Sequence, residues 1–338
     1  MPPPVLIVGQ GIAGSALGWA CEQAGIDFEI ADAGHGPAAS RVGAGILNPV
    51  TGRRLAPTWG FDAWIGQSVA LYRAMEAAVG RPLIRPMRIY RRFRDAAERA
   101  ALSARWSPGE VAPAHVGPRD ADGFWIEDVW QVDTAAVLAE LRARWLRSGR
   151  LRIGAASAAS VAAEAARRDV IILCGGAEVA DAFDFVPWER AAGEILSGMT
   201  TGLDPGVILH RGHWVLPLGV DRARVGATYE VSAGEARPTP AGRAELAQTA
   251  RELLAPDGFT VTGHEAGVRL GTKDRRPCIG RHPTTPGLGL LGGLGSKGAL
   301  WAPALARQWV NHLTEAVPFD REVDVGRFFR PCCADEAR

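Results

Sequence analysis

The chain has 338 residues, of which 47% are hydrophobic and 22% are charged, and its formal net charge at pH 7 is +1. This length allows a sizeable buried core and suggests about two folding units. The charge balance gives no electrostatic footprint for nucleic acid, and we interpret the arginines from Arg88 to Arg94 as a solvated face. Met1–Pro4 carry no basic residue, so we expect neither a signal peptide nor a membrane span.

The cysteines are scattered along the chain without a Cys-x-x-Cys pair; they are Cys21, Cys174, Cys278, Cys332 and Cys333. The first three fall in apolar or turn segments, which suits reduced and buried thiols in the cytoplasm. The pattern indicates neither a zinc site nor a disulfide framework. We therefore expect a cytoplasmic protein with no metal ligands.

A short apolar run, Val5–Val8, leads directly into a Gly-x-Gly-x-x-Gly turn. Such a run is typical of a strand covered on both faces. Gly9 permits the tight turn, Gly11 leaves room for a pyrophosphate, and Gly14 allows the following helix to pack closely. The helix N-terminus then faces the phosphates. The segment predicts a dinucleotide site in a Rossmann-like fold; the alternative is a glycine turn in some other βαβ unit.

Small and apolar residues follow this turn at helical spacing: Ala13, Ala16, Leu17, Ala20 and Ala24. Gly25 is predicted to end the helix, and Asp27–Asp32 to form the next strand. Asp32 lies about twenty residues beyond the glycines, where an acidic side chain accepts hydrogen bonds from ribose hydroxyls.

The next region predicts a helix over Phe61–Val79 with one buried face, formed by Ile65, Val69, Tyr72, Met75 and Ala78. After it we expect a strand, a helix and another strand, over Pro82–Tyr90, Asp95–Ala104 and Gly123–Trp130. We interpret this region as an insertion that carries substrate contacts.

Asp133 or Thr134 is predicted to cap a helix that runs through Leu146. Its buried side contains Val137, Leu138, Leu141 and Trp145. The segments Leu151–Ile153 and Asp169–Ala177 are expected to return as strands to the nucleotide sheet, the second ending in a further glycine turn at Gly175. The Ala-rich stretch between them predicts helix or short strand pieces.

From Pro187 to Gly263 the pattern favours an antiparallel sheet, with strands at Ile195–Met199, Val207–His210, Trp214–Leu218 and Arg224–Thr228. A helix is expected from about Pro240 to Leu254. A last strand over Leu288–Gly293 leads through the turn Leu294–Gly298 into a helix that contains Pro303. That turn predicts a second helix N-terminus that can bind an anion. A simple dinucleotide site does not account for this second turn, whereas a flavin would use it.

Together these segments resemble the D-amino-acid oxidase-type FAD oxidoreductases, most closely the glycine oxidase branch. The most specific parts are Gly267–Pro283 and Gly293–Pro303, and Ser40–Pro49 and Val225–Glu230 also match. The resemblance implies a mixed α/β fold. In it, residues 1–80, 130–185 and 266–338 form a Rossmann-like FAD-binding domain, and residues 81–129 and 186–265 form an inserted antiparallel-sheet substrate domain.

The resemblance implies that FAD is bound at the two glycine turns and the loop after Ser40. Ile12 and Ala13 would bind the pyrophosphate, and Asp32 and Ala33 the adenosine ribose. The expected cofactor contacts are Gly9, Gly11, Ile12, Ala13, Gly14, Asp32, Ala33, Ser40, Ala44, Gly45, Ile46, Gly175, Gly293, Gly295, Ser296, Lys297, Gly298, Ala299, Leu300 and Trp301. No cysteine occupies the position where sarcosine-oxidase relatives attach FAD, so a noncovalent flavin is expected.

Arg269 falls where the family holds the substrate carboxylate, a task suited to its rigid fork. The alternative is a structural ion pair with Glu265 or Asp274. Trp214 replaces an aromatic hydroxyl of glycine oxidase, and Ser296 replaces a second arginine, for which Lys297 offers a substitute charge. These departures indicate that the substrate differs; the expected substrate contacts are Arg269, Trp214, Ser296 and Lys297.

The implied reaction is oxidation of the C–N bond of a small amino acid or secondary amine that carries a carboxylate. A hydride passes to flavin N5, the imine hydrolyses, and oxygen or an electron carrier reoxidises the flavin. This chemistry depends on positioning, so no side chain is assigned as a catalytic acid or base. The histidines form no constellation; His210 and His213 flank the Trp214 strand, where a structural role is favoured.

Two other functions stay open. One is the FAD domain of the bifunctional tRNA wobble-uridine modification enzyme, which acts on a carboxymethylamino group. The near-zero net charge argues against this function, because a chain of this charge is not expected to have a nucleic-acid partner. The missing methyltransferase domain also argues against it. The other is a flavin-binding electron-transfer subunit without turnover of its own. Homo-oligomerisation is compatible with each function.

Overall fold

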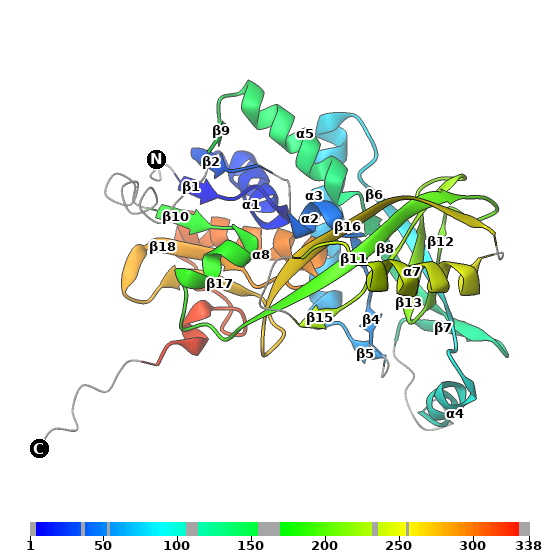
Figure 1. Ribbon diagram of the computed structural model, residues 1–338. Coiled ribbons are helices and arrows are strands. Elements are labelled where there is room, and N and C mark those ends of the chain that lie inside the picture. The colour runs from blue at the N-terminus through cyan, green and yellow to red at the C-terminus, as the bar shows by residue number, and fades with distance from the viewer. Residues whose placement is uncertain are drawn as a thin grey trace, which may run out of the picture. The chain divides into compact units, whose positions relative to one another are not determined.

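The computed structural model describes residues 5–34, 38–52, 55–105, 114–154, 170–231, 236–254 and 257–330. The chain divides into two compact units (Figure 1). Unit 1 contains Met1–Gly36, Leu138–Arg190 and Arg269–Arg338, and unit 2 contains Pro37–Val137 and Ala191–Val268. The FAD-binding and substrate domains expected from the sequence have bounds that differ from those of these units. The assignment of FAD and substrate to separate domains stays a prediction.

Unit 1 is built on a six-stranded sheet in the order β17-β18-β10-β1-β2-β9. Its strands are β1 (Val5–Val8), β2 (Phe28–Asp32), β9 (Leu151–Ile153), β10 (Val170–Leu173), β17 (Cys278–His282) and β18 (Thr285–Gly292). All neighbours pair parallel except β17 and β18. Ile7 of β1 lies between Ile172 and Ile30, and none of these side chains is exposed, as expected for a central parallel strand.

The helices of this unit are α1 (Ile12–Gln23), most of α5 (Thr134–Arg147) and α8 (Gly298–Glu315), with 3₁₀ turns η1 (Gly176–Asp181) and η2 (Val325–Phe328). A Cβ added at Gly18 of α1 would lie 2.9 Å from Cη2 of Trp145, so the missing side chain permits close packing with α5. The predicted bounds of α1 are confirmed within three residues, and α8 follows the predicted turn and contains Pro303.

The N-cap and the buried face predicted for α5 are confirmed. The backbone N–H of Ala136 donates to Oδ1 of Asp133 at 3.0 Å, so Asp133 caps the first turn. The residues of the predicted buried face of α5 are each at most 2% exposed: Val137, Leu138, Leu141 and Trp145. The Ala-rich stretch that follows β9, residues 155–169, lies outside the described residues.

Unit 2 contains most of a ten-stranded sheet in the order β15-β11-β14-β13-β12-β6-β8-β3, with β16 beside β11 and β7 beside β8. Its strands are β3 (Ile46–Leu47), β6 (Ile84–Arg92), β7 (Val116–Arg119), β8 (Gly123–Val132), β11 (Trp188–Thr200), β12 (Val207–Arg211), β13 (His213–Pro217), β14 (Arg222–Gly226), β15 (Glu230–Val231) and β16 (Phe259–Thr272). Most neighbours pair antiparallel as predicted, whereas β6 and β12 pair parallel.

The other elements of unit 2 are α2 (Ala39–Val42), α3 (Phe61–Val79), α4 (Ala96–Arg105), α7 (Pro240–Leu253), and the pair β4 (Val50–Thr51) and β5 (Ala56–Pro57). The predicted bounds of α3 are confirmed, but its predicted face is partly wrong, because Ile65 and Val69 are half-buried and Ala78 is exposed. The buried residues are Phe61, Trp64, Ser68, Tyr72 and Met75. Burying the aromatic rings removes more apolar area from water than burying the aliphatic alternatives.

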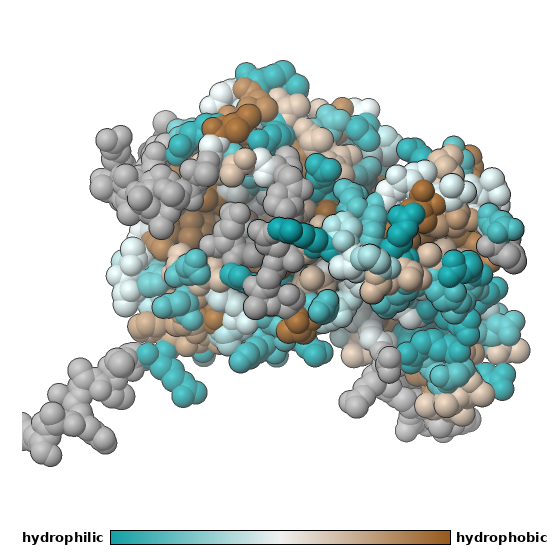
Figure 2. All heavy atoms as spheres, viewed as in Figure 1, coloured by the Kyte–Doolittle hydropathy of each residue, from teal (hydrophilic) through white to brown (hydrophobic). Residues whose placement is uncertain are grey.

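The interpretation of Arg88–Arg94 as a solvated face is wrong for Arg91. This side chain is 6% exposed and pairs with Oε1 of Glu98 on α4 at 2.9 Å. Arg88, which points the other way, is largely exposed and pairs with Glu127. Hydrophilic residues gather over α4 in Figure 2. Strand alternation therefore divides the cluster between a buried ion pair and the surface.

Cys21, Cys174 and Cys278 are free and buried, as expected. Cys332 and Cys333 lie outside the described part of the chain. None of the helices that the structure describes has both the length and the hydropathy needed to cross a membrane.

Candidate active site

The first glycine turn joins β1 to α1 and fits a dinucleotide. Gly9 has φ +97°, and a Cβ there would lie 2.9 Å from Cα of Gly175 at the end of β10. A Cβ at Gly14 would overlap the carbonyl oxygen of Gly9. Gly11 provides no side-chain cap for α1, which begins at Ile12. The turn thus presents the positive end of a helix without side-chain obstruction, the arrangement that binds a pyrophosphate.

Asp32, the last residue of β2, is 8% exposed and lies beside this turn. Its Oδ2 accepts a hydrogen bond from the backbone N–H of Gln10 at 2.8 Å. Its Oδ1 accepts from the N–H of Gly34 at 2.9 Å and from Nη1 of Arg142 at 2.7 Å. Ala33 follows and is exposed. The carboxylate therefore has a fixed orientation at the position where a ribose is expected.

The second glycine turn lies next to the first within unit 1. Gly293 and Gly295 have φ values of +68° and +49°, so both need the left-handed conformation that glycine tolerates. A Cβ at Gly298, the first residue of α8, would lie 2.9 Å from Cγ2 of Ile12. The structure thus brings the two turns predicted to bind FAD together, although they lie at opposite ends of the chain.

Lys297 precedes α8, and its partly buried side chain has a perturbed ionisation. Burial lowers the pKa of the Lys297 ammonium to about 8. The neighbouring Ser296 is exposed and Ala299 is half-buried. Leu300 and Trp301 are 2% and 4% exposed, so their side chains belong to the core. The turn carries a positive charge at the positive end of a helix, an arrangement that favours an anionic group.

Arg269 is half-buried on β16, beside the second turn. The next residue, Leu270, accepts a hydrogen bond from the N–H of Gly295 at 2.8 Å. Each of the carboxylates proposed as alternative partners of Arg269 pairs with other arginines: Glu265 with Arg41 and Arg224, and Asp274 with Arg327.

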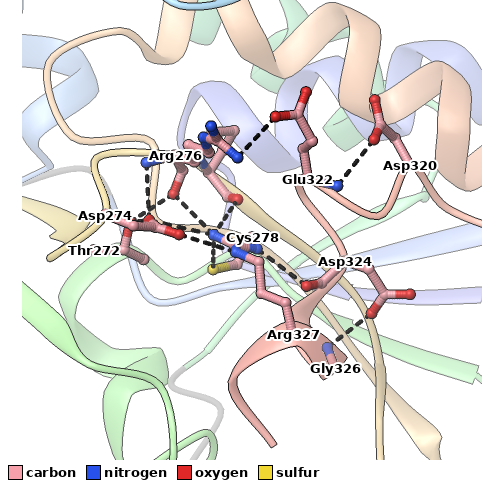
Figure 3. Close-up of polar contacts among 10 residues, drawn as sticks. Thr272, Asp274, Arg276, Cys278, Asp320, Glu322, Asp324, Gly326 and Arg327 are labelled. Carbon is pink, nitrogen blue, oxygen red and sulfur yellow. Dashed lines mark hydrogen bonds and ion pairs between the residues drawn. The ribbon is translucent and has the colours of Figure 1, made fainter.

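Arg327 fixes the turn between β16 and β17, as Figure 3 shows. Its Nε donates to Oδ2 of Asp274 at 3.0 Å, and its Nη2 donates to the carbonyl of Pro277 at 3.0 Å. The hydroxyl of Thr272 donates to Oδ1 of Asp274 at 2.7 Å. Sequence reasoning missed Arg327, since a pairing across 53 residues leaves no local signal.

The loop expected along the flavin edge lies in unit 2. Ser40 belongs to α2, and Ala44, Gly45 and Ile46 lead from it into β3. Gly45 has φ +67°, and its carbonyl accepts from the N–H of Val132 at 2.9 Å. A Cβ at Gly45 would overlap the carbonyl oxygen of Val132, so the loop lies very close to the backbone of β8.

Trp214 also lies in unit 2, on β13, and is half-buried between β14 and β12. A Cβ at Gly226 would lie 2.8 Å from Cζ2 of Trp214. His210 of β12 lies opposite Trp214 in the antiparallel pair with β13. Burial, with Arg91 nearby, lowers the pKa of the His210 imidazole to about 3 and keeps this ring neutral. Nε2 of His213 lies 2.8 Å from Oε1 of Glu245. We infer from these contacts that the sheet holds Trp214, His210 and His213 in place.

Comparisons with known proteins extend these observations. The family described as "FAD dependent oxidoreductase" (DAO) matches residues 4–311. The glycine oxidase of Pseudomonas putida is 31% identical over 156 residues, which is 44% of this chain and 43% of that protein. The tRNA 5-methylaminomethyl-2-thiouridine biosynthesis bifunctional protein MnmC of Caulobacter sp. strain K31 is 26% identical over 97% of this chain and 58% of that protein. The chain thus spans less than two thirds of these relatives.

Solved structures show the same fold. Iminodiacetate oxidase from Chelativorans sp. BNC1 superposes with a TM-score of 0.75 at 22% identity, over 94% of this chain and 98% of that one. Glycine oxidase from Geobacillus kaustophilus gives 0.73 at 20% identity, over 96% and 97%. The nucleotide turn on a parallel sheet and the mixed second sheet are thus those of an FAD-dependent oxidase fold. The chain belongs to the DAO family and is an FAD-dependent oxidoreductase.

Proposed function

We propose that this enzyme oxidises the C–N bond of a small amino acid or secondary amine that carries a carboxylate. The observation that carries the proposal is the position of Arg269, whose neighbour Leu270 is hydrogen-bonded to Gly295 of the second turn. Glycine and iminodiacetate, after which similar proteins are named, both carry a carboxylate next to the amine-bearing carbon. A planar guanidinium binds such a group at two points.

In this proposal FAD is bound noncovalently, with its pyrophosphate at the first turn and its ribose at Asp32. The residues Ser296–Trp301, at the second turn, contact the flavin. FAD, when bound, supplies the acceptor for a hydride and its electron pair. Arg269 holds the carboxylate and so fixes the substrate C–H, while Lys297 adds a second positive charge. Oxygen is the proposed acceptor that regenerates the flavin, giving hydrogen peroxide.

A second candidate is oxidation of the side chain of a modified wobble uridine in tRNA. Matches to the MnmC proteins extend over 97% and 93% of this chain, whereas the match to the Pseudomonas putida glycine oxidase extends over 44%. A carboxymethylamino group would offer Arg269 the same carboxylate as a free amino acid. The two candidates therefore share the chemistry at the reacting carbon and differ in the bulk attached to the amine.

Anaerobic mixing of the purified yellow protein with glycine, sarcosine, iminodiacetate, larger N-substituted glycines and tRNA tests these candidates. Substrate oxidation bleaches the flavin band in the blue, and readmission of air should restore it with release of peroxide. Bleaching by a free amino acid supports the first candidate. Bleaching by tRNA alone, with a salt-sensitive affinity, supports the second. A flavin that no amine reduces would contradict both and indicate an electron-transfer subunit.

A further inference from the structure

A buried polar network connects α5 to the first glycine turn through Arg142. Nη1 of Arg142 donates to Oδ1 of Asp32 at 2.7 Å and to Oε1 of Gln10 at 2.9 Å. The Gln10 side chain is fully buried, and its Nε2 donates to the carbonyl of Leu138 on α5 at 3.1 Å. The side chains of Arg142 and Asp32 are only 16% and 10% exposed, so water screens their attraction weakly.

We propose that Arg142 is a positioning residue for the adenosine half of FAD, acting through Asp32 and Gln10. This inference rests on the proposed role of Asp32 at the ribose. One guanidinium nitrogen contacts both the carboxylate and the amide oxygen, so it fixes the Asp32 rotamer relative to the turn at Gln10. Because Gln10 lies between Gly9 and Gly11, the same contact holds the pyrophosphate-binding backbone against α5.

Removing Arg142 leaves a poorly hydrated carboxylate with its backbone donors but without its cation. The backbone donors alone then orient the carboxylate toward the ribose, and the side chain of Gln10 loses a donor. Lysine keeps the charge, but its ammonium nitrogen ends one bond nearer the backbone than Nη1 of arginine and so reaches the two acceptors less well. FAD affinity should therefore follow the order arginine, lysine, methionine at this position.

The same helix offers a matched control in Arg144. Its guanidinium pairs with Glu22 on α1 and, like Arg142, joins α5 to another element of unit 1. Its side chain is 39% exposed, and its guanidinium contacts Glu22 and the ring of Trp19, both on α1. Arg144→Met therefore removes an arginine ion pair from α5 without disturbing the proposed network.

Equilibrium dialysis of the flavin-depleted chain against FAD measures the effect. We expect Arg142→Met to weaken FAD binding by about 10- to 100-fold, Arg142→Lys by less, and Arg144→Met by less than about threefold. Asp32→Asn should weaken binding at least as much as Arg142→Met. The double variant Asp32→Asn/Arg142→Met should lose less affinity than the product of the two single losses, because Arg142 acts in part through Asp32. ADP, which lacks the flavin, should lose affinity in Arg142→Met by the same factor.

Several results would overturn the proposal. An Arg142→Met protein that binds FAD as tightly as the wild type, while Asp32→Asn binds weakly, would refute the role of Arg142 but not that of Asp32. Unchanged affinity in Asp32→Asn would refute both roles. A double variant whose loss equals the product of the single losses, or an unchanged ADP affinity, would show that Arg142 acts elsewhere. Should Arg142→Met fail to fold, Arg142→Gln and Arg142→Lys provide the same comparison.

Discussion

At the scale of single residues, unit 1 carries two cationic side chains beside the second turn, with different environments. Arg269 lies on a strand, where the pairing of Leu270 with Gly295 fixes its backbone. Lys297 lies before a helix, and burial weakens its charged form. An arginine stays charged at any physiological pH, so the two residues are suited to different tasks.

Arg269→Lys should reduce activity far more than it reduces folding or FAD content. Lysine retains the charge but loses the two-point contact, and a misaligned carboxylate moves the reacting C–H out of position. We expect kcat/KM to fall by roughly 2–4 kcal/mol in transition-state free energy, measured with the best substrate of the amine panel. Matched thermal melts serve as the control. A variant with normal turnover, or a best substrate without a carboxylate, would contradict the assignment.

Lys297→Met should stabilise the flavin-free chain near neutral pH. The pKa of Lys297 falls from 10.5 to about 8 on folding, so between these values the unfolded chain binds more protons and wild-type stability rises with pH. At pH 7 the variant avoids burying a charge and should gain roughly 1–3 kcal/mol. Urea denaturation at pH 7 and pH 10 measures this. The gain should shrink at the higher pH; a pH-independent difference would argue against it.

At the scale of elements, the short helix α2 and the loop after it depend on a buried arginine of β14. Arg224 donates through Nη2 to the carbonyl of Val42 at 2.6 Å and through Nη1 to that of Gly43 at 3.1 Å. A four-residue helix makes too few internal hydrogen bonds to persist alone, and its last carbonyls need donors. Burial lowers the pKa of the Arg224 guanidinium.

Arg224→Met should therefore loosen residues 38–47 before the rest of unit 2. We expect faster amide exchange in that segment and a loss of about 2–3 kcal/mol in stability, because two partly buried carbonyls lose a charged donor. Arg222→Met is the control, since Arg222 lies on the same strand with a side chain 65% exposed. Equal exchange in the two variants would show that α2 does not depend on Arg224.

At the scale of the whole molecule, the candidate residues are divided between the two compact units. Unit 1 carries both glycine turns, Asp32, Arg269 and Lys297, whereas unit 2 carries Trp214 and the loop Ser40–Ile46. The strands β11 and β16 each run from one unit into the other along the sequence.

The flavin should be released by acid precipitation, because the proposed site holds it by hydrogen bonds and charge. The three described cysteines are buried, and burial raises the pKa of the Cys278 thiol to about 12, which disfavours a nucleophilic thiolate. Yellow supernatant over a colourless pellet is the expected result, and added FAD should raise the melting temperature of refolded chain. Flavin that stays with the pellet after denaturation would indicate a covalent bond.

The sequence by itself determined the elements whose signals are local. The strand and glycine turn at Val5–Gly14, the bounds of α3 and the Asp133 cap of α5 each depend on residues a few positions apart. Their spacing reflects the geometry of one turn or one helix. The second glycine turn indicated a flavin, and the resemblance implied that one FAD contacts both turns. The structure places these turns side by side within unit 1.

Only the tertiary structure decided which distant side chains meet. The parallel pairing of β6 with β12, the burial of Arg91 against Glu98, and the contact of Arg142 with Asp32 follow from how strands and helices pack. Arginines at the same spacing can form a solvated face or a buried ion pair. Which of the two forms depends on whether folding brings a carboxylate from another element close to them. Arg142 and Asp32 lie 110 residues apart, so their attraction exists only after the sheet and α5 have come together.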